Sequence, residues 1–350
     1  MADAPEVFVF EESPQEAYAA SSLAERLVSS EISAPLVIAS AHGLALASEI
    51  DAIRPVRTPP DSADQRWASE LGAAAIDAGA GAIVAVGGGR CLDLGKLAAA
   101  RAGLTVFVVP TQLSHDGICS PVAVVPNEDG RAESVGAVAP RGVYLSLPTL
   151  LGAPSASVAA GIGDLLANPL SLRDWALAAE RGLEEIDQRA WDMSAESFSV
   201  IEPFLESDPE ALARDPGFLK TLARALVLSG TAMIISGTSR PASGAEHEIS
   251  HAIDHLYPGR ALHGAQVAFG AIFSVALYEE NTDLFRERLE RLGLPQHPRE
   301  LGLSEDDVVE VLLEAPDTRP GRFTVLEHAN LDRDSARRLT RRIWGSSLTL

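Results

Sequence analysis

Lysine is almost missing from this sequence of 350 residues, in which Lys96 and Lys220 are the only two. Basic residues number 28 in all against 49 acidic ones, which gives a formal net charge of −21. Because so acidic a surface repels nucleic acid and anionic membranes, we expect neither as a partner. Any site for an anionic small molecule must therefore gather its positive charge locally.

Cysteine and long apolar runs are also scarce. Cys91 and Cys119 are the only cysteines, and they form neither a CxxC motif nor a disulfide framework. The acidic opening MADAPEVFVFEES lacks the basic and apolar regions of a secretory signal. No uninterrupted apolar run approaches the roughly 18 residues of a membrane span. We therefore expect a soluble, cytoplasmic protein without membrane insertion.

Aromatic residues make up only 5% of the chain, although 46% of it is hydrophobic. The core must then be filled mainly by Ala, Val, Leu and Ile, which favours layered α/β or helical packing over a β-sandwich. The length is more than one ordinary core needs and suits two domains that share a cleft.

The first part of the chain alternates short apolar runs with Ala- and Leu-rich segments. Strands are predicted at 6–10, 35–40, 82–86 and 105–109, with a helix at 14–29. This alternation indicates a parallel sheet built from βαβ units. From about residue 155 helical periodicity takes over. We therefore predict an α/β domain at 1–154 and an all-helical domain at 155–350, with the active site in the cleft between them.

Two glycine- and hydroxyl-rich loops follow predicted strands. The first is GGGRCLDLGK at 87–96, and the second is PTQLSHDGICS at 110–120. Ligands of an open parallel sheet bind at the carboxyl ends of its strands, and glycines let backbone amides approach a diphosphate. The loops therefore indicate a dinucleotide site. A purely steric explanation also exists, because glycine turns and helix caps are common after strands.

Histidines gather in the second part of the chain. His247 and His251 stand four residues apart, so both lie on one face of a helix, and His263 opens a following helix. With the carboxylate of Asp164, two imidazoles would supply the three protein ligands of a catalytic zinc site. Such a histidine pair can also sit on a solvated helix face. The run from His247 to His251 matches HExxH as well, which leaves a metallohydrolase with Glu248 as general base as an alternative.

Taken together, these motifs give the chain a family resemblance. The loops at 87–96 and 110–120, GIGDLL at 161–166, SRPASGAEHEISHAID at 239–254 and ALHGAQV at 261–267 resemble the sn-glycerol-1-phosphate dehydrogenase family. That family belongs with the iron-containing alcohol dehydrogenases, glycerol dehydrogenases and dehydroquinate synthases.

The resemblance implies a Rossmann-like first domain, a helical second domain and a homo-oligomer. The expected reaction is the NADH- or NADPH-linked reduction of dihydroxyacetone phosphate, or of a related phosphorylated or phosphonate ketone. The implied metal is Zn²⁺, held by Asp164, His247 and His263. Asp116, Asp164 and His251 would act on the substrate. The implied dinucleotide contacts are Gly87, Gly88, Gly89, Arg90, Cys91, Leu92, Asp93, Thr111, Ser114 and Ser120.

Some positions separate the chain from other members of the superfamily. Asn168 stands where iron alcohol dehydrogenases carry a histidine ligand, which favours three protein ligands and zinc. A cyclase or lyase of the dehydroquinate synthase type is an alternative, although such enzymes use glutamate where this chain has Asp164. Arg240 is a candidate for binding the substrate phosphate or, equally, for a structural ion pair.

Three positions also depart from the family pattern. Ser146 replaces a usual aspartate, Ala265 replaces a usual glutamate, and Pro169 is expected to interrupt the helix that follows Asp164. We expect all three to lie at the substrate end of the cleft, where they would bear on substrate identity more than on the type of reaction.

Overall fold

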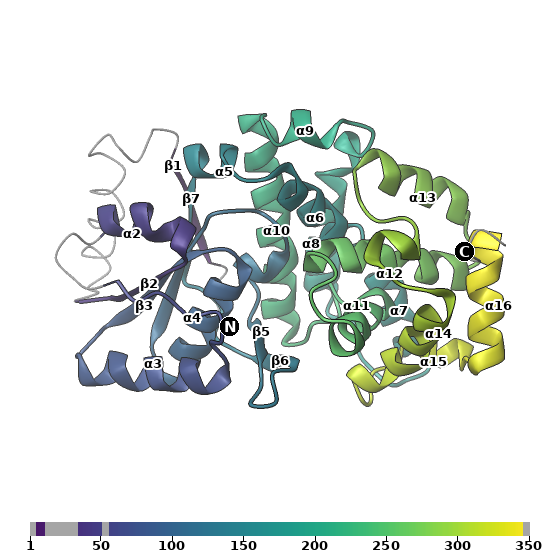
Figure 1. The fold of residues 1–350 in the computed structure, drawn as a ribbon, viewed down its shortest axis with the longest axis horizontal. Coiled ribbons are helices and arrows are strands. Elements are labelled where there is room, and N and C mark those ends of the chain that lie inside the picture. Colours follow the sequence, from purple (N-terminus) through teal and green to yellow (C-terminus); the bar gives the residue numbers. More distant parts are fainter. Residues whose placement is uncertain (1–4, 11–33, 51–55, 346–350) are drawn as a thin grey trace.

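The computed structural model describes residues 5–10, 34–50 and 56–345 (Figure 1). The helix expected at 14–29 lies outside these residues. The described elements form a sheet with its covering helices at one end of the molecule and a helical assembly at the other (Figure 1).

The sheet has five parallel strands in the order β1-β7-β4-β3-β2. Their bounds are Glu6–Phe10 for β1, Leu36–Ala39 for β2, Ala82–Gly87 for β3, Thr105–Pro110 for β4 and Gly142–Ser146 for β7. All four strands predicted from the apolar runs are confirmed within one residue at either end. The three central strands, β7, β4 and β3, are buried almost throughout, as parallel strands covered by helices are.

Helices cover both faces of this sheet. Ile83 and Ala85 of β3 pack with α3 (Gln65–Asp77) and α4 (Gly89–Ala102) on one face. Val84 and Val86 point to the other face, toward α2 (Leu44–Ile50) and the short helix η1 (Ala41–Gly43). The side chains alternate because successive residues of a strand face opposite sides.

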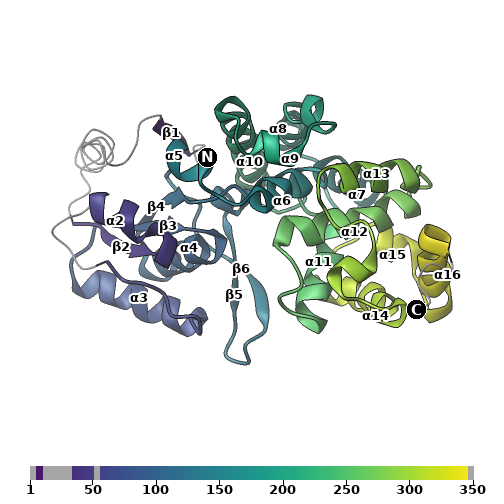
Figure 2. The same ribbon diagram turned by 45° about the horizontal axis from the view of Figure 1, so that its top comes forward.

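An antiparallel hairpin that the sequence analysis did not predict leaves the sheet after β4. It consists of β5 (Val122–Pro126) and β6 (Ala132–Gly136), and the short helix η2 (Asp116–Ile118) precedes it. In Figure 2 the hairpin projects alongside the junction between the sheet and the helical assembly. It is therefore placed to form one wall of the space between them.

The rest of the chain is helical. The α-helices are α5 (Leu147–Leu151), α6 (Ser155–Leu165), α7 (Asn168–Glu180), α8 (Gln188–Ser199), α9 (Pro209–Leu212), α10 (Pro216–Ser236), α11 (Ala245–Leu256), α12 (His263–Leu277), α13 (Thr282–Arg291), α14 (Glu305–Glu314), α15 (Val325–Ala329) and α16 (Arg333–Trp344). Three 3-10 helices lie among them, η3 (Glu202–Phe204), η4 (Pro298–Leu301) and η5 (Ala315–Thr318). The architecture of an α/β unit followed by a helical unit is thus confirmed, while the division at 154/155 stays a prediction.

Among the described helices, α10 is the one that is long and apolar enough to cross a membrane, with a mean hydropathy of 1.5. However, 67% of that apolar window is buried inside the protein. Leu222, Ala225 and Leu226 belong to the main hydrophobic core and are fully buried. The apolar character of α10 is therefore accounted for by its place in the core.

Pro169 does not interrupt a helix, which corrects the prediction. Helix α6 ends at Leu165, and Pro169 stands in the first turn of the separate helix α7. The missing N–H of proline costs little there, because the first amides of a helix have no partner within it.

Candidate active site

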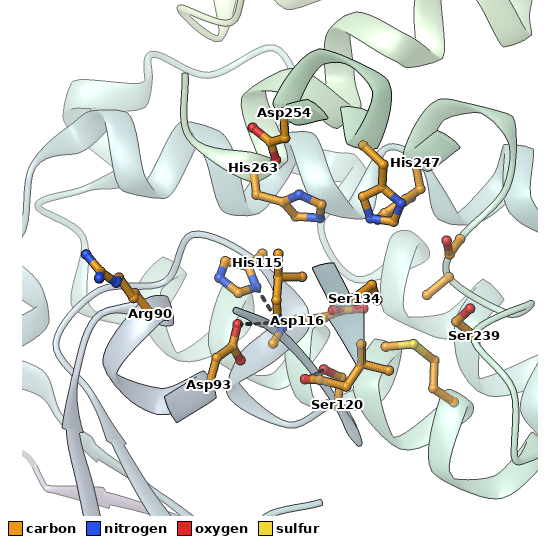
Figure 3. A pocket seen from close by; sticks show the side chains of 18 of the residues that line it. Arg90, Asp93, His115, Asp116, Ser120, Ser134, Ser239, His247, Asp254 and His263 are labelled. Atoms are coloured by element: carbon orange, nitrogen blue, oxygen red, sulfur yellow. Dashed lines mark hydrogen bonds between the residues drawn. The ribbon is translucent and has the colours of Figure 1, made fainter. Parts of the chain in front are cut away.

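A cavity of about 400 Å³ opens between the sheet and the helical assembly (Figure 3). Figure 3 shows His247 and His263 on one side of it and His115 and Asp116 on the facing side. The loop at the carboxyl end of β4 supplies the second pair, while α11 and α12 supply the first. The structure thus brings the two groups of motifs singled out in the sequence into one cleft.

The first glycine loop is tightly packed at the start of α4. Gly88 precedes the helix as its N-cap without any side-chain cap, so the helix N-terminus is open to a ligand. A side chain at Gly89 would collide with His115 of the second loop, and one at Gly87 would come within 2.8 Å of Cys91 and Ser40. Glycine is therefore needed at 87 and 89 because a side chain there would collide with its neighbours. At Gly89 the neighbour belongs to the second loop, so the two loops pack closely against each other.

A second cavity of about 860 Å³ runs along these loops and meets the first at Gly89, Arg90, His115 and His263. Six residues expected at the dinucleotide line it: Gly88, Gly89, Arg90, Cys91, Thr111 and Ser114. Asp93 and Ser120 line the 400 Å³ cavity instead. Gly87 lines neither cavity, and the side chain of Leu92 lies in the core with 1% exposure.

The candidate metal site is formed by Asp164, His247 and His263. One ligand atom of each lies within 4.8 Å of the others. Asp164 Oδ1 is 3.7 Å from His247 Nε2 and 3.8 Å from His263 Nε2. The three side chains come from α6, α11 and the first residue of α12. The arrangement brings together the three residues that the sequence analysis named.

Close helix packing explains why these residues meet. A Cβ atom at Gly163 would lie 2.5 Å from the carbonyl oxygen of Gly264, so only glycine lets α6 and α12 approach this closely. Asp164 and His263 are the sequence neighbours of these two glycines. The start of α11 is held by carboxylates, since Asp174 accepts from the amide of Ala245 at 2.8 Å.

The hydrogen bonding of the three side chains fits a cation. Asp164 Oδ2 accepts the amide of Asp116 at 2.8 Å, but Oδ1 is buried and has no hydrogen-bond partner. His247 Nδ1 lies 3.1 Å from Glu246 Oε1, which leaves Nε2 directed at Asp164. A histidine that binds a metal usually donates its other ring N–H to a carboxylate, which fixes the orientation of the imidazole. A buried, unpartnered carboxylate oxygen between two imidazole nitrogens is thus the donor set that Zn²⁺ accepts.

The electrostatics of the cluster are set by burial and by these contacts. Burial lowers the pKa of His247, but the neighbouring carboxylates of Asp164 and Glu246 outweigh it and raise the pKa to about 9. Burial lowers the pKa of His263 to about 3, against the attraction of Asp164. Burial raises the pKa of Asp164, but the nearby imidazoles of His247 and His263 hold it below its usual value. Asp164 is therefore a carboxylate at neutral pH.

His251 lines the cavity without joining the cluster of possible ligands, which among the described residues consists of the other three. Its ring centre is 6.4 Å from that of His247 and 6.2 Å from that of His263. Glu248 is fully buried and accepts from Thr324 Oγ1 at 3.1 Å, away from the cavity. The HExxH interpretation, with two histidine ligands and Glu248 as base, is therefore wrong for this chain.

Asp116 belongs to a hydrogen-bonded chain that reaches α7. Its Oδ2 accepts from Ser229 at 2.8 Å, and Ser229 in turn accepts from Asn168 at 3.1 Å. Asn168 is thus engaged in structure, in agreement with its expected absence from the ligand set. Burial, followed by repulsion from Asp164, raises the pKa of Asp116 to about 7.

Lys96 is buried beneath the second loop, a role that the sequence analysis missed. Its ammonium pairs with Asp93 at 2.8 Å and donates to the carbonyl oxygens of Gly117 at 2.8 Å and Val122 at 2.5 Å. Asp93 also accepts the amide of Val124 at 3.0 Å. One lysine therefore fixes both the Asp116 loop and the start of the hairpin.

Arg240 forms a structural ion pair and does not line the 400 Å³ cavity, so the ion pair, and not phosphate binding, is its role. It is 1% exposed, pairs with Glu184 through two nitrogens and donates to the carbonyl oxygen of Phe323 at 2.8 Å. Besides Arg90, the cavity is lined by Arg319, which the sequence analysis did not single out. Arg319 lies in the loop between η5 and α15, and no motif near it in the sequence indicates a place in the cavity.

The three departures from the family pattern, Ser146, Pro169 and Ala265, do not line the 400 Å³ cavity. The expectation that they shape its substrate end is wrong. Ser146 instead caps α5 by accepting from the amide of Thr149 at 3.4 Å. Ala265 packs against the core in the first turn of α12.

Comparison with known proteins agrees with this site. Residues 13–154 match the family model described as iron-containing alcohol dehydrogenase. Among solved structures, a probable glycerol dehydrogenase from Sinorhizobium meliloti superposes with a TM-score of 0.78 at 19% identity, covering 98% of this chain and 97% of that one. Glycerol dehydrogenase from Schizosaccharomyces pombe gives 0.76 at 16% identity, covering 98% and 90%. These likenesses establish the fold.

Sequence relatives are more specific. Glycerol-1-phosphate dehydrogenase [NAD(P)+] of Cenarchaeum symbiosum is 36% identical over 261 residues, which cover 75% of this chain and 72% of the relative. The enzyme of the same name from Thermococcus kodakarensis is 37% identical over 260 residues, covering 74% and 73%. The chain therefore belongs to the glycerol-1-phosphate dehydrogenase family of iron-containing alcohol dehydrogenases and is an NAD(P)- and metal-dependent oxidoreductase.

Proposed function

We propose that this enzyme reduces dihydroxyacetone phosphate to sn-glycerol 1-phosphate, with Zn²⁺ held by Asp164, His247 and His263. The observation that carries the proposal is the buried, unpartnered Oδ1 of Asp164 between two imidazole nitrogens, one of them from His263, which lines both cavities. The names of the relatives supply the substrate, and the donor set supplies the metal.

Each cavity takes one reactant. The 860 Å³ cavity, lined by the two strand-end loops, accommodates the dinucleotide, with its diphosphate at the open N-terminus of α4. The 400 Å³ cavity accommodates the ketone. His115 and His263 line both cavities, so the reacting carbons of cofactor and substrate come together beside them.

When bound, zinc supplies Lewis-acid polarisation of the carbonyl, and the reduced nicotinamide supplies the hydride. The residues of the chain orient the substrate and manage one proton, since a ketone becomes an alcohol by gaining a hydride and a proton. His251 Nδ1 accepts from Arg319 Nε at 3.5 Å, so its Nε2 carries the hydrogen that faces the substrate. The Asp116 carboxyl, whose pKa is about 7, supplies the proton that the new hydroxyl gains, and His251 Nε2 donates a hydrogen bond that positions the substrate oxygen.

The proposal includes two further expectations. The active site lies between domains at 1–154 and 155–350, and the enzyme is a homo-oligomer, which light scattering tests. A related phosphorylated or phosphonate ketone is the second candidate substrate. Its turnover is compared with that of dihydroxyacetone phosphate in the same assay.

The test is the loss of reduced-nicotinamide absorbance when dihydroxyacetone phosphate is added with NADH or NADPH. The product is then offered to an sn-glycerol-3-phosphate dehydrogenase. We expect oxidation of the cofactor and a product which that second enzyme leaves untouched. No oxidation with dihydroxyacetone phosphate, or a product that is fully consumed, would overturn the proposed reaction.

A further inference from the structure

Two arginines at the cavity have no acidic partner. Arg319 lines the cavity, and Arg322 lies behind it, three residues along the chain. Among the described residues no carboxylate is within ion-pair distance of either guanidinium, although Arg240 close by is paired with Glu184. In a chain with a net charge of −21, two adjacent arginines without a direct ion pair are unusual, and the acidic groups of Glu246 and Glu248 attract them only from beyond ion-pair distance. Half-buried positive charge of this kind is stabilised when an anion binds.

The hydroxyl of Ser239 joins the two guanidinium groups. Arg319 Nη1 and Arg322 Nη2 each donate to Ser239 Oγ at 2.8 Å. A serine hydroxyl has two acceptor lone pairs and one donor hydrogen, so both lone pairs are occupied and only the hydrogen is left. Ser239 can then act only as a donor toward a ligand. The same holds in part for Ser134 of the hairpin, whose Oγ accepts from Arg319 Nη2 at 3.4 Å.

The position of this group suits one end of the substrate. Figure 3 shows Ser239 at the opposite end of the pocket from Arg90, which marks the dinucleotide end. Arg319 Nε contacts His251, whose ring lies beside those of the metal-binding histidines. The imidazole of His251 thus lies between Arg319 and the position that the substrate carbonyl would take at the metal. In dihydroxyacetone phosphate only a methylene and an ester oxygen separate carbonyl carbon from phosphorus.

We propose that Arg319, Arg322 and the hydroxyl of Ser239 form the subsite that binds the phosphate of the substrate. Arg319 contacts the phosphate directly, Ser239 donates its hydroxyl hydrogen, and Arg322 holds Ser239 in that orientation and adds charge. The hairpin closes the subsite through Ser134. This inference rests on the proposed function for the identity of the ligand, while the recognition of a tetrahedral oxyanion comes from the chain itself.

The kinetic test compares dihydroxyacetone phosphate with dihydroxyacetone, which lacks the phosphate. In Arg319→Ala we expect KM for the phosphorylated ketone to rise about 30-fold or more, because charge-assisted hydrogen bonds are lost. The KM for dihydroxyacetone should change by less than roughly threefold. Because Arg319 Nε also holds His251 Nδ1, kcat should fall by a similar factor with both ketones, so the difference between the two KM values isolates the phosphate. Arg319→Lys keeps the positive charge but loses the paired donors of the guanidinium. Its KM for dihydroxyacetone phosphate should therefore lie between those of the wild type and Arg319→Ala.

The matched control is Arg131→Ala. Arg131 is exposed at the neighbouring cavity and its substitution removes the same charge, so it should leave both KM values unchanged. Equal increases in the two arginine-to-alanine variants would show that net charge, and not a subsite, governs binding. Unchanged KM for dihydroxyacetone phosphate in Arg319→Ala would overturn the inference.

A binding measurement separates this inference from the proposed reaction. Calorimetric titration should show that the wild-type protein binds inorganic phosphate and that dihydroxyacetone phosphate competes with it. The Arg319→Ala variant should show no such binding. If the wild type turns over no dihydroxyacetone phosphate but binds phosphate through Arg319, the reaction is wrong and the oxyanion subsite stands. If both proteins bind phosphate equally, or neither binds it, the subsite is wrong.

Discussion

His263 Nε2 lies 3.8 Å from Asp164 Oδ1 across the crossing of α6 and α12. The two residues meet because each follows or precedes a glycine at the point of closest backbone approach, Gly163 and Gly264. The metal site is therefore built into the packing of the helical assembly, and His247 completes it from α11. Because the ligands are held on packed helices, substitution of one ligand should change metal binding without rearranging the others.

Metal affinity should rise with pH. Below about pH 9 the metal-free protein holds a proton on His247, whose pKa is raised to about 9 and which must be neutral to bind a metal. His263 is already neutral, because its pKa is lowered to about 3. We expect zinc affinity to increase about tenfold per pH unit from about pH 7.5 to 9 and then level off. Competition with a chromogenic chelator measures it, and a flat profile would contradict the protonation of His247.

Substitution of His251 should separate catalysis from metal binding. His251→Asn leaves the cluster of Asp164, His247 and His263 intact, so the variant should retain as much zinc as the wild type. It removes the donor at Nε2, and we expect kcat to fall roughly 10²- to 10⁴-fold. Metal analysis and steady-state kinetics on the same preparation test this. A variant that loses its zinc would make His251 a ligand and revive the HExxH arrangement.

Substitution at Gly88 should impair the dinucleotide site alone. A Cβ atom in Gly88→Ala would lie 3.1 Å from the amide end of Gln112, a flexible group, so the fold should tolerate it. The added methyl stands at the N-terminus of α4, where backbone amides must approach the diphosphate. We expect KM for the nicotinamide cofactor to rise about tenfold, with zinc content unchanged.

Gly136→Ala is its control, because nothing lies within 4 Å of a Cβ atom there. Both variants exchange one glycine for one alanine, and only the first stands at the dinucleotide cavity. A KM that rises equally in both, or in neither, would place the diphosphate elsewhere.

Removal of Lys96 should destabilise the protein. Lys96→Met leaves the carboxylate of Asp93 buried without its cation and removes the ammonium donor from three carbonyl oxygens. We expect a loss of roughly 3–5 kcal/mol in the free energy of unfolding, because breaking a buried pair strands a charge. Arg66→Ala, which breaks the exposed pair with Glu70, should leave Tm nearly unchanged. Thermal unfolding of both variants decides whether the buried pair contributes as expected.

Local patterns were enough to predict most of the sheet and the metal ligands. The four predicted strands coincide with short apolar runs, of which two end at Gly87 and Pro110, and the ligand types are those that zinc prefers. The β5–β6 hairpin was missed, although Asn127, Asp129 and Gly130 supply the turn residues between its strands. These turn residues are sufficient to predict the hairpin from the sequence.

Other features could not be predicted because they depend on contacts between distant parts of the chain. Arg319 bonds Ser134 across 185 positions, and nothing near it in the sequence distinguishes it from Arg240, which is buried in an ion pair. The spacing of His247 and His251 puts both on one helix face, but only the approach of α12 decides that His263 takes the second imidazole position. Helix packing, and not spacing, chooses the ligands.

The most direct measurement is reconstitution of metal-depleted protein with zinc, followed by cofactor oxidation with dihydroxyacetone phosphate, in the wild type and in Asp164→Asn. The wild type should lose activity to a chelator and regain it in proportion to zinc, with an end point at one ion per chain. Asp164→Asn, whose neutral amide supplies no carboxylate charge between the imidazoles, should bind zinc far more weakly and stay inactive at that end point. Full activity of the metal-depleted wild type, or an Asp164→Asn variant that binds zinc and turns over like the wild type, would contradict the assignment.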